Sequence, residues 1–365
     1  MTTFLIVIFL LVLIVIGFMQ QPMFGATPKG KRQELIKQSQ HFKNGQFQNL
    51  SDTPNFTEGA TFYSILKEFF FVKHERRRPL KDLPSVNTDL HALPLSENVL
   101  VWFGHSSYYL QIDGKRFLVD PVFSGAASPI PPTTRSFKGA DVYNADDIPQ
   151  LDYLVITHDH WDHLDYKTVL KLKPKTGKVI CGLGTGQHLE RWGFDLNKII
   201  ERQWNEMVQL ENGFTIHTAP ARHFSGRGFK RNQSQWMSYV LQTPSIKIYI
   251  GGDSGYDTHF KNTGDLHGPF DLVILECGQY NKSWKYIHML PDEITKAAND
   301  LKAKKLLAVH WGKFQLANHP WDEPIIKVSQ YAAENNLTLL TPLIGEVVDL
   351  KNENQQFSKW WIGIN

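Results

Sequence analysis

Cysteine is scarce in this chain, where only two of the 365 residues are cysteines, Cys181 and Cys277. Two thiols cannot build the disulfide framework on which small secreted domains depend. Each cysteine stands beside an apolar, strand-like run, so we expect two buried free thiols rather than a bridge or a catalytic pair. A chain of this length also buries enough apolar surface to fold without cross-links.

The chain also lacks an excess of charge of either sign. Its formal net charge is +3 at pH 7, and acidic and basic residues are mixed instead of forming long blocks. A small, mixed charge argues against a broad basic surface of the kind that binds nucleic acid. We therefore expect no nucleic-acid partner.

Charge is wholly absent from residues 4–19, which read FLIVIFLLVLIVIGFM. With its neighbours this run approaches the roughly 20 apolar residues that cross a bilayer. A cleaved signal peptide is the alternative, but no basic residue precedes the run, and Lys29, Lys31 and Arg32 follow it. We therefore predict an uncleaved membrane anchor, with the remaining chain on the cytoplasmic side by the positive-inside rule.

Three regions are predicted along the chain: an N-terminal membrane anchor or signal segment at 1–24, an extended, proline-containing arm at 25–95, and a main domain at 96–365. Within the arm, residues 62–72 predict an amphipathic helix that packs on the main domain or contacts lipid. In the main domain, strand-like runs alternate with helical segments, which predicts an α/β fold. The expected strands are 99–103, 107–112, 116–119, 152–156, 178–181, 214–218, 238–241, 247–250, 272–275 and 306–309, with a helix at 291–303.

One motif carries most of the chemistry. The apolar run LDYLVI is followed by His158, His160, Asp162 and His163 in the pattern H-x-H-x-D-H. Histidines two residues apart after a strand can direct their rings into one pocket, while the aspartate and the last histidine face a second position nearby. Imidazole and carboxylate ligands without a thiolate favour a catalytic zinc site, with manganese or iron as alternatives. The spacing predicts two metal ions rather than one.

Three further ligand-type residues follow strand-like runs: His223 after FTIHT, Asp253 after KIYIGG, and His310 after LLAV. Ligands at the carboxyl ends of strands lie where α/β sheets place their sites. Taken singly, each has an ordinary explanation as a loop or core residue. Together with the H-x-H-x-D-H motif, they favour one shared metal site. His105, Asp120 and His288 stand in similar places and are candidates for supporting or contacting it.

The motifs THDHWDHLD, PARHFS, GGDSGYD and HWGKF resemble the metallo-β-lactamase superfamily. The run WFGHSSYYLQIDGKRFLVDPVFS is similar in particular to the branch of N-acylphosphatidylethanolamine-hydrolysing phospholipase D. The resemblance implies an αβ/βα sandwich, in which two sheets lie back to back with helices outside. It also implies two zinc ions at one edge of the sandwich.

Carried over residue by residue, the resemblance assigns His158, His160 and His223 to the first metal, Asp162, His163 and His310 to the second, and Asp253 to a bridge between them. It also implies that His288 contacts the substrate phosphate. Asp159, Asp253 and His288 are the candidates for moving a proton during catalysis.

We therefore predict a dinuclear zinc-dependent hydrolase, a phosphodiesterase of phospholipase D type that acts on N-acylphosphatidylethanolamine-like phospholipids. A lactonase or other small-ester hydrolase of the same fold is the alternative, because fold does not fix substrate. A non-enzymatic membrane protein is less favoured, since the ligand pattern is intact. The expected partners are a phospholipid or small phosphodiester and a membrane, with a homodimer as one option for the assembly.

Overall fold

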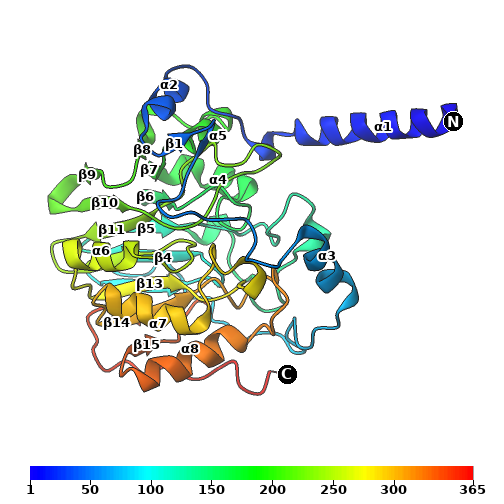
Figure 1. The fold of residues 1–365 in the computed structure, drawn as a ribbon. Helices are drawn as coiled ribbons and strands as arrows, with labels where there is room; N and C mark the ends of the chain where they lie inside the picture. The colour runs from blue at the N-terminus through cyan, green and yellow to red at the C-terminus, as the bar shows by residue number, and fades with distance from the viewer. Residues whose placement is uncertain (365) are drawn as a thin grey trace.

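The computed structural model describes residues 1–364, apart from the side chain of Phe70, so that Asn365 at the end of the predicted main domain lies outside the described residues. Two seven-stranded sheets form the body, in the orders β16-β3-β4-β5-β6-β7-β8 and β15-β14-β13-β12-β11-β10-β9. A small hairpin of β1 and β2 lies apart from them. The α/β sandwich expected from the sequence is confirmed (Figure 1).

The first sheet consists of β3 (Val99–Trp102), β4 (Tyr108–Ile112), β5 (Lys115–Val119), β6 (Leu151–Ile156), β7 (Thr176–Gly182), β8 (Ile199–Arg202) and β16 (Val347–Asp349). The second consists of β9 (Met207–Gln209), β10 (Thr215–Ala219), β11 (Ser238–Gln242), β12 (Lys247–Ile250), β13 (Leu272–Glu276), β14 (Lys305–Val309) and β15 (Thr338–Leu340). The separate hairpin pairs β1 (Phe42–Lys43) with β2 (Gln46–Phe47).

The helices are α1 (Thr2–Met19), α2 (Gly30–Gln38), α3 (Phe62–Phe71), α4 (Tyr166–Leu172), α5 (Gly186–Arg191), α6 (His259–His267), α7 (Pro291–Asp300) and α8 (Glu323–Glu334). Buried residues of α4 and α5 pack on the first sheet, and those of α6, α7 and α8 pack on the second. Helices therefore cover the outer face of each sheet, and the inner faces of the two sheets pack against each other.

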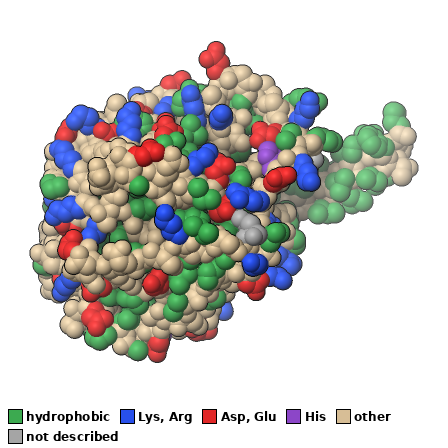
Figure 2. Space-filling view, turned by 90° about the horizontal axis from the view of Figure 1, so that it is seen from below, with side chains coloured by type: hydrophobic (Ala, Val, Ile, Leu, Met, Phe, Trp, Pro, Cys, Tyr) green, Lys and Arg blue, Asp and Glu red, His purple; other side chains and the backbone are tan. Residues whose placement is uncertain are grey.

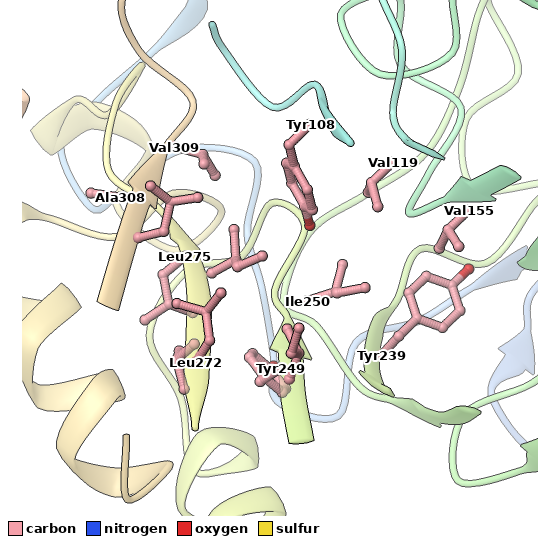
Figure 3. Packing of buried hydrophobic residues seen from close by; sticks show 14 of the residues in the cluster. Tyr108, Val119, Val155, Tyr239, Tyr249, Ile250, Leu272, Leu275, Ala308 and Val309 are labelled. Carbon is pink, nitrogen blue, oxygen red and sulfur yellow. The ribbon is translucent and has the colours of Figure 1, made fainter. Parts of the chain in front are cut away.

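The main core lies between the two sheets. Tyr108 and Val119 of the first sheet face Tyr239 and Ile250 of the second, and all four are at most 2% exposed (Figure 3). Strands of this kind are rich in β-branched and aromatic residues, which suit a pleated surface that is buried on both faces. Both cysteines are buried and free, as the sequence predicts.

Local signals in the sequence explain most boundaries. Asp113 and Gly114 have φ values of +47° and +78°, which is the primed turn expected between β4 and β5. The predicted helix at 291–303 ends early, at Asp300, because Lys302 adopts a left-handed φ of +57° and turns the chain toward β14. The edge strands β8, β9, β15 and β16 were not expected, since their short runs are partly exposed and lack a clear alternation.

Helix α1 projects from the body with all of its side chains outside the core (Figures 1 and 2). By length and composition it could cross a membrane, a property that anchors and signal sequences share. On the face seen in Figure 2, acidic and basic side chains are mixed over the body, in agreement with the small net charge. The arm that follows α1 contributes Ile36, Phe47 and Leu83 to the main core.

Candidate metal centre

The predicted ligands come together because the strands that precede them run in the same direction. In the first sheet, β5 and β6 are parallel; in the second, β12, β13 and β14 are parallel, and β10 shares their direction through two antiparallel pairings. The carboxyl ends of these strands therefore meet at one edge of the sandwich. The backbone joins the sheets there, since His105 N–H donates to Trp311 O (2.8 Å) and His310 N–H donates to His105 O (2.9 Å).

Three histidines form the first group. The ligand nitrogens of His158, His160 and His223 all lie within 4.8 Å of one another. His158 Nε2 is 2.9 Å and His223 Nε2 is 3.2 Å from His160 Nδ1. Nitrogen atoms of three neutral rings that point at a common space are arranged as metal ligands.

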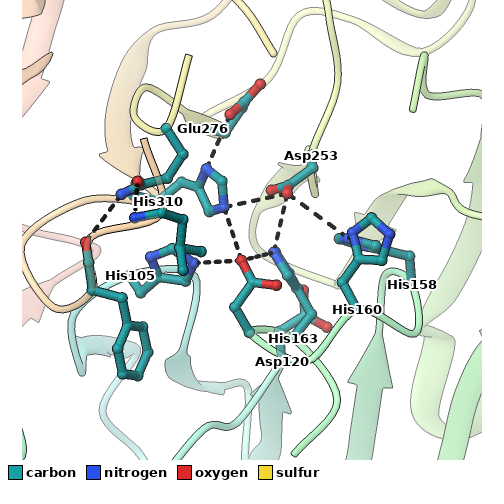
Figure 4. Close-up of polar contacts among 12 residues, drawn as sticks. His105, Asp120, His158, His160, His163, Asp253, Glu276 and His310 are labelled. Carbon is teal, nitrogen blue, oxygen red and sulfur yellow. Dashed lines mark hydrogen bonds and ion pairs between the residues drawn. The ribbon is translucent and has the colours of Figure 1, made fainter. Parts of the chain in front are cut away.

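Asp253 lies at the centre of the cluster (Figure 4). Its Oδ2 is 3.8 Å from His158 Nε2 and 3.7 Å from His223 Nε2, both in the first group. The same oxygen is 3.2 Å from His163 Nε2 and 3.2 Å from His310 Nε2. One carboxylate oxygen thus reaches both groups of predicted ligands.

The second group contains Asp162, His163 and His310, and the structure adds His105 to it. Asp162 Oδ2 is 2.9 Å from His105 Nε2, 3.3 Å from His310 Nε2 and 3.6 Å from His163 Nε2. His105 is completely buried. Its place after a strand, in WFGHSS, was the sequence signal that marked it as a supporting candidate.

Burial keeps the three histidines of the first group neutral. It lowers the pKa of His160 to about 4 and holds the pKa values of His158 and His223 well below the usual range. In His158 the neighbouring histidines act in the same direction as burial. The neutral ring is the form that binds a metal ion, so these residues are prepared as ligands at pH 7.

His163 and His310 behave differently. Burial lowers the pKa of His310, but the charge of Asp253 and the bonds to Asp162 and Glu276 outweigh it and raise the pKa to about 10. The pKa of His163 is also raised, against burial, by Asp253 and Asp162. These rings share protons with the carboxylates, and a bound metal ion would have to displace those protons.

Two buried polar atoms in the cluster, His160 Nε2 and Asp253 Oδ1, make no hydrogen bond, and His163 Nε2 has only its ion-pair contacts with Asp253 and Asp162. Such groups are costly to bury unless a partner compensates them. A divalent cation is such a partner, and a donor set of imidazole and carboxylate fits zinc. Among the described residues, neither cysteine belongs to any cluster with metal-ligand geometry.

Two further carboxylates orient the ligand rings. Glu276, at the end of β13 and completely buried, accepts hydrogen bonds from His288 Nδ1 (2.9 Å) and His310 Nδ1 (3.1 Å). Asp120, after β5, accepts from His163 Nδ1 (2.8 Å). A carboxylate that accepts a hydrogen bond from the back of a ligand ring fixes the tautomer and the direction of that ring. Sequence reasoning missed Glu276, although a charged residue that closes the apolar run LVIL was a usable signal.

The structure does not place Asp159 in the site. One of its carboxylate oxygens accepts from Gly226 N–H (2.6 Å), and the other contacts Ser234 Oγ (2.9 Å) and His188 Nε2 (3.1 Å). Asp159 lines a different pocket, beside the segment that follows α1. Asp159 is not among the residues that line the cavity at the ligand cluster, and its proton-transfer role stays a prediction.

A cavity of about 460 Å³ leads to the cluster. Its polar floor includes His288, whose Nδ1 is held by Glu276, and five of the predicted ligands: His160, Asp162, His223, Asp253 and His310. Arg231 also lines it, with its guanidinium 4.4 Å from the ring centre of Phe224. Among the ion pairs of the described residues, none involves Arg231. The apolar wall consists of Phe56, Phe62, Ile65, Phe224, Trp284, Ile287 and Leu316.

Comparison with known proteins agrees with this geometry. Residues 115–311 match the family model described as "Beta-lactamase superfamily domain". An uncharacterized protein of Mycobacterium tuberculosis is 36% identical over 331 residues, covering 90% of this chain and 88% of that protein. N-acyl-phosphatidylethanolamine-hydrolyzing phospholipase D 1 of Caenorhabditis elegans is 29% identical over 77% of this chain and 83% of its own length.

Among solved structures, the metallo hydrolase Igni18 of Ignicoccus hospitalis is similar in fold. The TM-score is 0.55 at 20% sequence identity, and the match covers 69% of this chain and 98% of that one. The sheet order, the clustered ligands and the family match agree with one another. The chain therefore belongs to the metallo-β-lactamase superfamily and has the fold of its metal-dependent hydrolases.

Proposed function

We propose that the protein is a dinuclear zinc phosphodiesterase of phospholipase D type that hydrolyses N-acylphosphatidylethanolamine-like phospholipids. In this proposal one zinc is held by His158, His160 and His223 and the other by Asp162, His163 and His310, with Asp253 contacting both. Two such ions would supply a hydroxide nucleophile near neutral pH and neutralise charge on the phosphoryl oxygens.

The protein's own residues would bind and orient the phosphodiester. Arg231 offers a cation inside the cavity, and a guanidinium is well suited to phosphate oxygens. The proton on His288 Nδ1 is directed to Glu276, so its Nε2 is the ring atom left to exchange a proton with a substrate. The second carboxylate oxygen of Asp253, Oδ1, makes no hydrogen bond. We therefore propose that Asp253, together with His288, moves a proton during catalysis.

The observation that carries the lipid assignment is the pairing of this polar floor with an apolar wall. Phe62 and Ile65, which belong to α3, form part of that wall, while Tyr63 and Phe71 of the same helix are 76% and 83% exposed. Helix α3 lies on the side from which α1 projects (Figure 1). If α1 anchors the chain in a membrane, the exposed residues of α3 and the cavity wall lie toward the bilayer. The activity named for the nematode relative supports the same substrate class.

The predicted chain organisation belongs to the same proposal. We propose that residues 1–24 anchor the enzyme, that residues 25–95 form an arm on the hydrolase domain, and that the domain lies on the cytoplasmic side. The buried, closely placed ligand set favours an enzyme over a non-enzymatic membrane protein, since a structural role alone would not maintain uncompensated buried ligands.

The test compares the full chain with Asp253→Asn in detergent micelles. Bound metal is measured by mass spectrometry, and hydrolysis is followed as release of N-acylethanolamine from N-acylphosphatidylethanolamine. We expect close to two metals per chain in the unmodified protein and a loss of turnover by more than about 100-fold in the variant. Asp257→Asn changes a carboxylate on the same loop outside the cluster, and should retain metal and turnover.

A panel of lactones and small esters is assayed beside the phospholipid. Full metal content with lactone or ester turnover, and none on the phospholipid, would replace the proposed substrate with a small ester. Arg231→Gln refines the result, because it should raise the KM for a phosphodiester while leaving the KM for a neutral lactone unchanged.

A further inference from the structure

The segment between α1 and α2 lies against the loop that carries the H-x-H-x-D-H motif. Phe24 packs edge-on against Trp161, with ring centres 5.1 Å apart, and Phe18 in the last turn of α1 packs on Phe24 at 5.2 Å. Trp161 stands between the proposed ligands His160 and Asp162. A row of three aromatic rings thus connects the predicted anchor to the ligand loop.

Arg227 makes a second connection between the same two segments. Its Nη1 donates to the carbonyl oxygens of Asp159 (2.8 Å) and Leu164 (2.7 Å), and three proposed ligands lie between these two residues. Its Nε and Nη2 donate to Met23 O, at 3.0 and 2.9 Å. The guanidinium lies 3.9 Å from the ring centre of Trp161. One side chain therefore binds both ends of the ligand loop and the segment after α1.

The third connection passes through His188. Its Nδ1 accepts a hydrogen bond from Ala26 N–H (3.0 Å), so the ring proton lies on Nε2, which donates to the Asp159 carboxylate (3.1 Å). Asp159 also accepts from Gly226 N–H and Ser234 Oγ. Asp159 stands between the proposed ligands His158 and His160. Its carboxylate is thus oriented, through His188, by the backbone of the segment after α1.

The close approach depends on glycine at position 25. Gly25 has a φ of +69°, and a Cβ there would lie 1.9 Å from His188 Nδ1. Trp192 Nε1 donates to Pro22 O (2.7 Å) and fastens the segment from the other side. Arg227, His188 and Trp192 bind main-chain groups of the segment. Because main-chain groups are the same at every position, no side-chain pattern in the sequence could predict these contacts.

Arg227 depends on this docking. The residue is only 3% exposed, and among the described residues no carboxylate lies within ion-pair distance of it. A buried guanidinium must have its donors satisfied, because a donor that loses its acceptor in a dry environment is strongly unfavourable. Without Met23 O, Nε and Nη2 would lose their acceptor, and the contacts that fix the guanidinium against the ligand loop would be reduced to Nη1 and the Trp161 ring.

We propose that Arg227 is a positioning residue for the metal centre and that residues 22–26 are a structural part of that centre. Docking of the segment supplies the acceptor for Arg227 and the donor for His188, and both hold the loop 159–164 in the geometry that presents its ligands. The predicted anchor and the metal centre are thereby coupled. This inference rests on the proposed ligands but not on the phospholipid substrate.

The test measures metal binding, not turnover, on the full chain in detergent micelles. The protein is loaded with Co²⁺ and dialysed against a chelator; the retained metal, the visible absorption spectrum and the Tm of the metal-free form are then measured. Arg227→Lys keeps the charge but cannot bridge two carbonyls and Met23 O. Gly25→Ala displaces the segment and leaves the Arg227 side chain itself unchanged.

Arg32→Lys is the matched control. Arg32 ties α2 to the body through Glu190 and Glu201 and makes no contact with the ligand loop. We expect both test variants to weaken metal retention by about 10-fold or more and to change the cobalt spectrum. Arg32→Lys should preserve both, even where its metal-free form has a lower Tm.

Unaltered retention and spectrum in both test variants would overturn the proposal. If Arg227→Lys does not fold, Gly25→Ala decides alone. An effect of Arg227→Lys without one of Gly25→Ala would refute the coupling to the segment. An unmodified protein that binds no cobalt would instead refute the metal centre of the proposed function, so the two failures are distinguishable.

Discussion

At the scale of single residues, the ends of three strands have an unusual backbone conformation. His105, Asp120 and His310 have φ values of +52°, +42° and +70°. Residues with a Cβ rarely adopt this region, which costs about 1 kcal/mol or more, and such strain concentrates at functional sites. All three side chains contact the ligand cluster. The strain thus lies where the chain must turn sharply after a strand and still direct a side chain inward.

Glu276 provides a residue-scale prediction. Glu276→Gln removes the charge that His288 and His310 donate to and places an amide N–H₂ near one of the two rings. We expect metal affinity to fall by about 10- to 100-fold, as when other groups that hydrogen-bond to a metal ligand are removed. Competition titration with a chromophoric chelator measures the change. Glu293→Gln, on the neighbouring helix α7, is the control, and equal affinities for the two variants would contradict the prediction.

His259 provides a second residue-scale prediction, which concerns the pH dependence of stability. Burial lowers the pKa of His259 to about 4 in the folded protein, against 6.5 in a model peptide. Between these values the unfolded chain binds the proton and the folded chain does not, so the free energy of unfolding falls as pH decreases from 6.5 to 4. The predicted loss reaches about 3 kcal/mol. The free energy of unfolding in urea should show no such loss in His259→Gln. If the free energy of the variant falls with pH as steeply as that of the unmodified protein, the prediction is refuted.

At the scale of elements, helix α3 exposes large aromatic side chains that a binding partner could cover. It is capped by Thr61, whose side chain accepts from Ser64 N–H, and it contacts the body through Glu68, which accepts from Asn281 Nδ2 (3.2 Å). The helix therefore forms from local signals, while much of its aromatic surface stays in solvent. An amphipathic helix of this kind, next to a cavity, is typical of an interfacial element.

The corresponding prediction concerns vesicles. Replacing Tyr63 and Phe71 with serine should reduce binding to phospholipid vesicles and turnover of vesicle-embedded substrate several-fold, because apolar area that would enter the bilayer is removed. Turnover of a short-chain, monomeric substrate should be unchanged. Leu266→Ser on α6 removes an exposed side chain on the other side of the molecule from α1 (Figure 1). A loss of the same size in that control would contradict a specific role for α3.

At the scale of the whole molecule, the candidate metal centre lies where the two sheets join. Met237 N–H of the second sheet's loop donates to Thr157 O of the first (3.0 Å), beside the ligands. His158 and Asp162 follow a strand of one sheet, while Asp253 and His310 follow strands of the other. Metal ions bound here would connect the two halves of the sandwich.

Metal removal should therefore destabilise the whole fold. Chelation is expected to lower the Tm by several degrees, since a ligand that binds only the folded state stabilises it. Affinity should rise with pH, because His310, with its pKa raised to about 10, must lose a proton to become a ligand. Calorimetric melting with and without chelator measures the shift. The Asp253→Asn variant should show little shift, and an equal shift in both proteins would show that the metal stabilises elsewhere.

The sequence by itself determined the α/β class, most strands of the two sheets and the proximity of the H-x-H-x-D-H ligands, because these depend on periodicity and on spacing within one loop. Tertiary structure decided what depends on distant contacts. It added His105 to the second group of ligands, placed Glu276 behind two rings, and set the Asp159 carboxylate against Gly226, Ser234 and His188. Main-chain groups of residues 22–26 hold Arg227 and His188 through bonds that leave no trace in a side-chain pattern, so only the folded chain could show them.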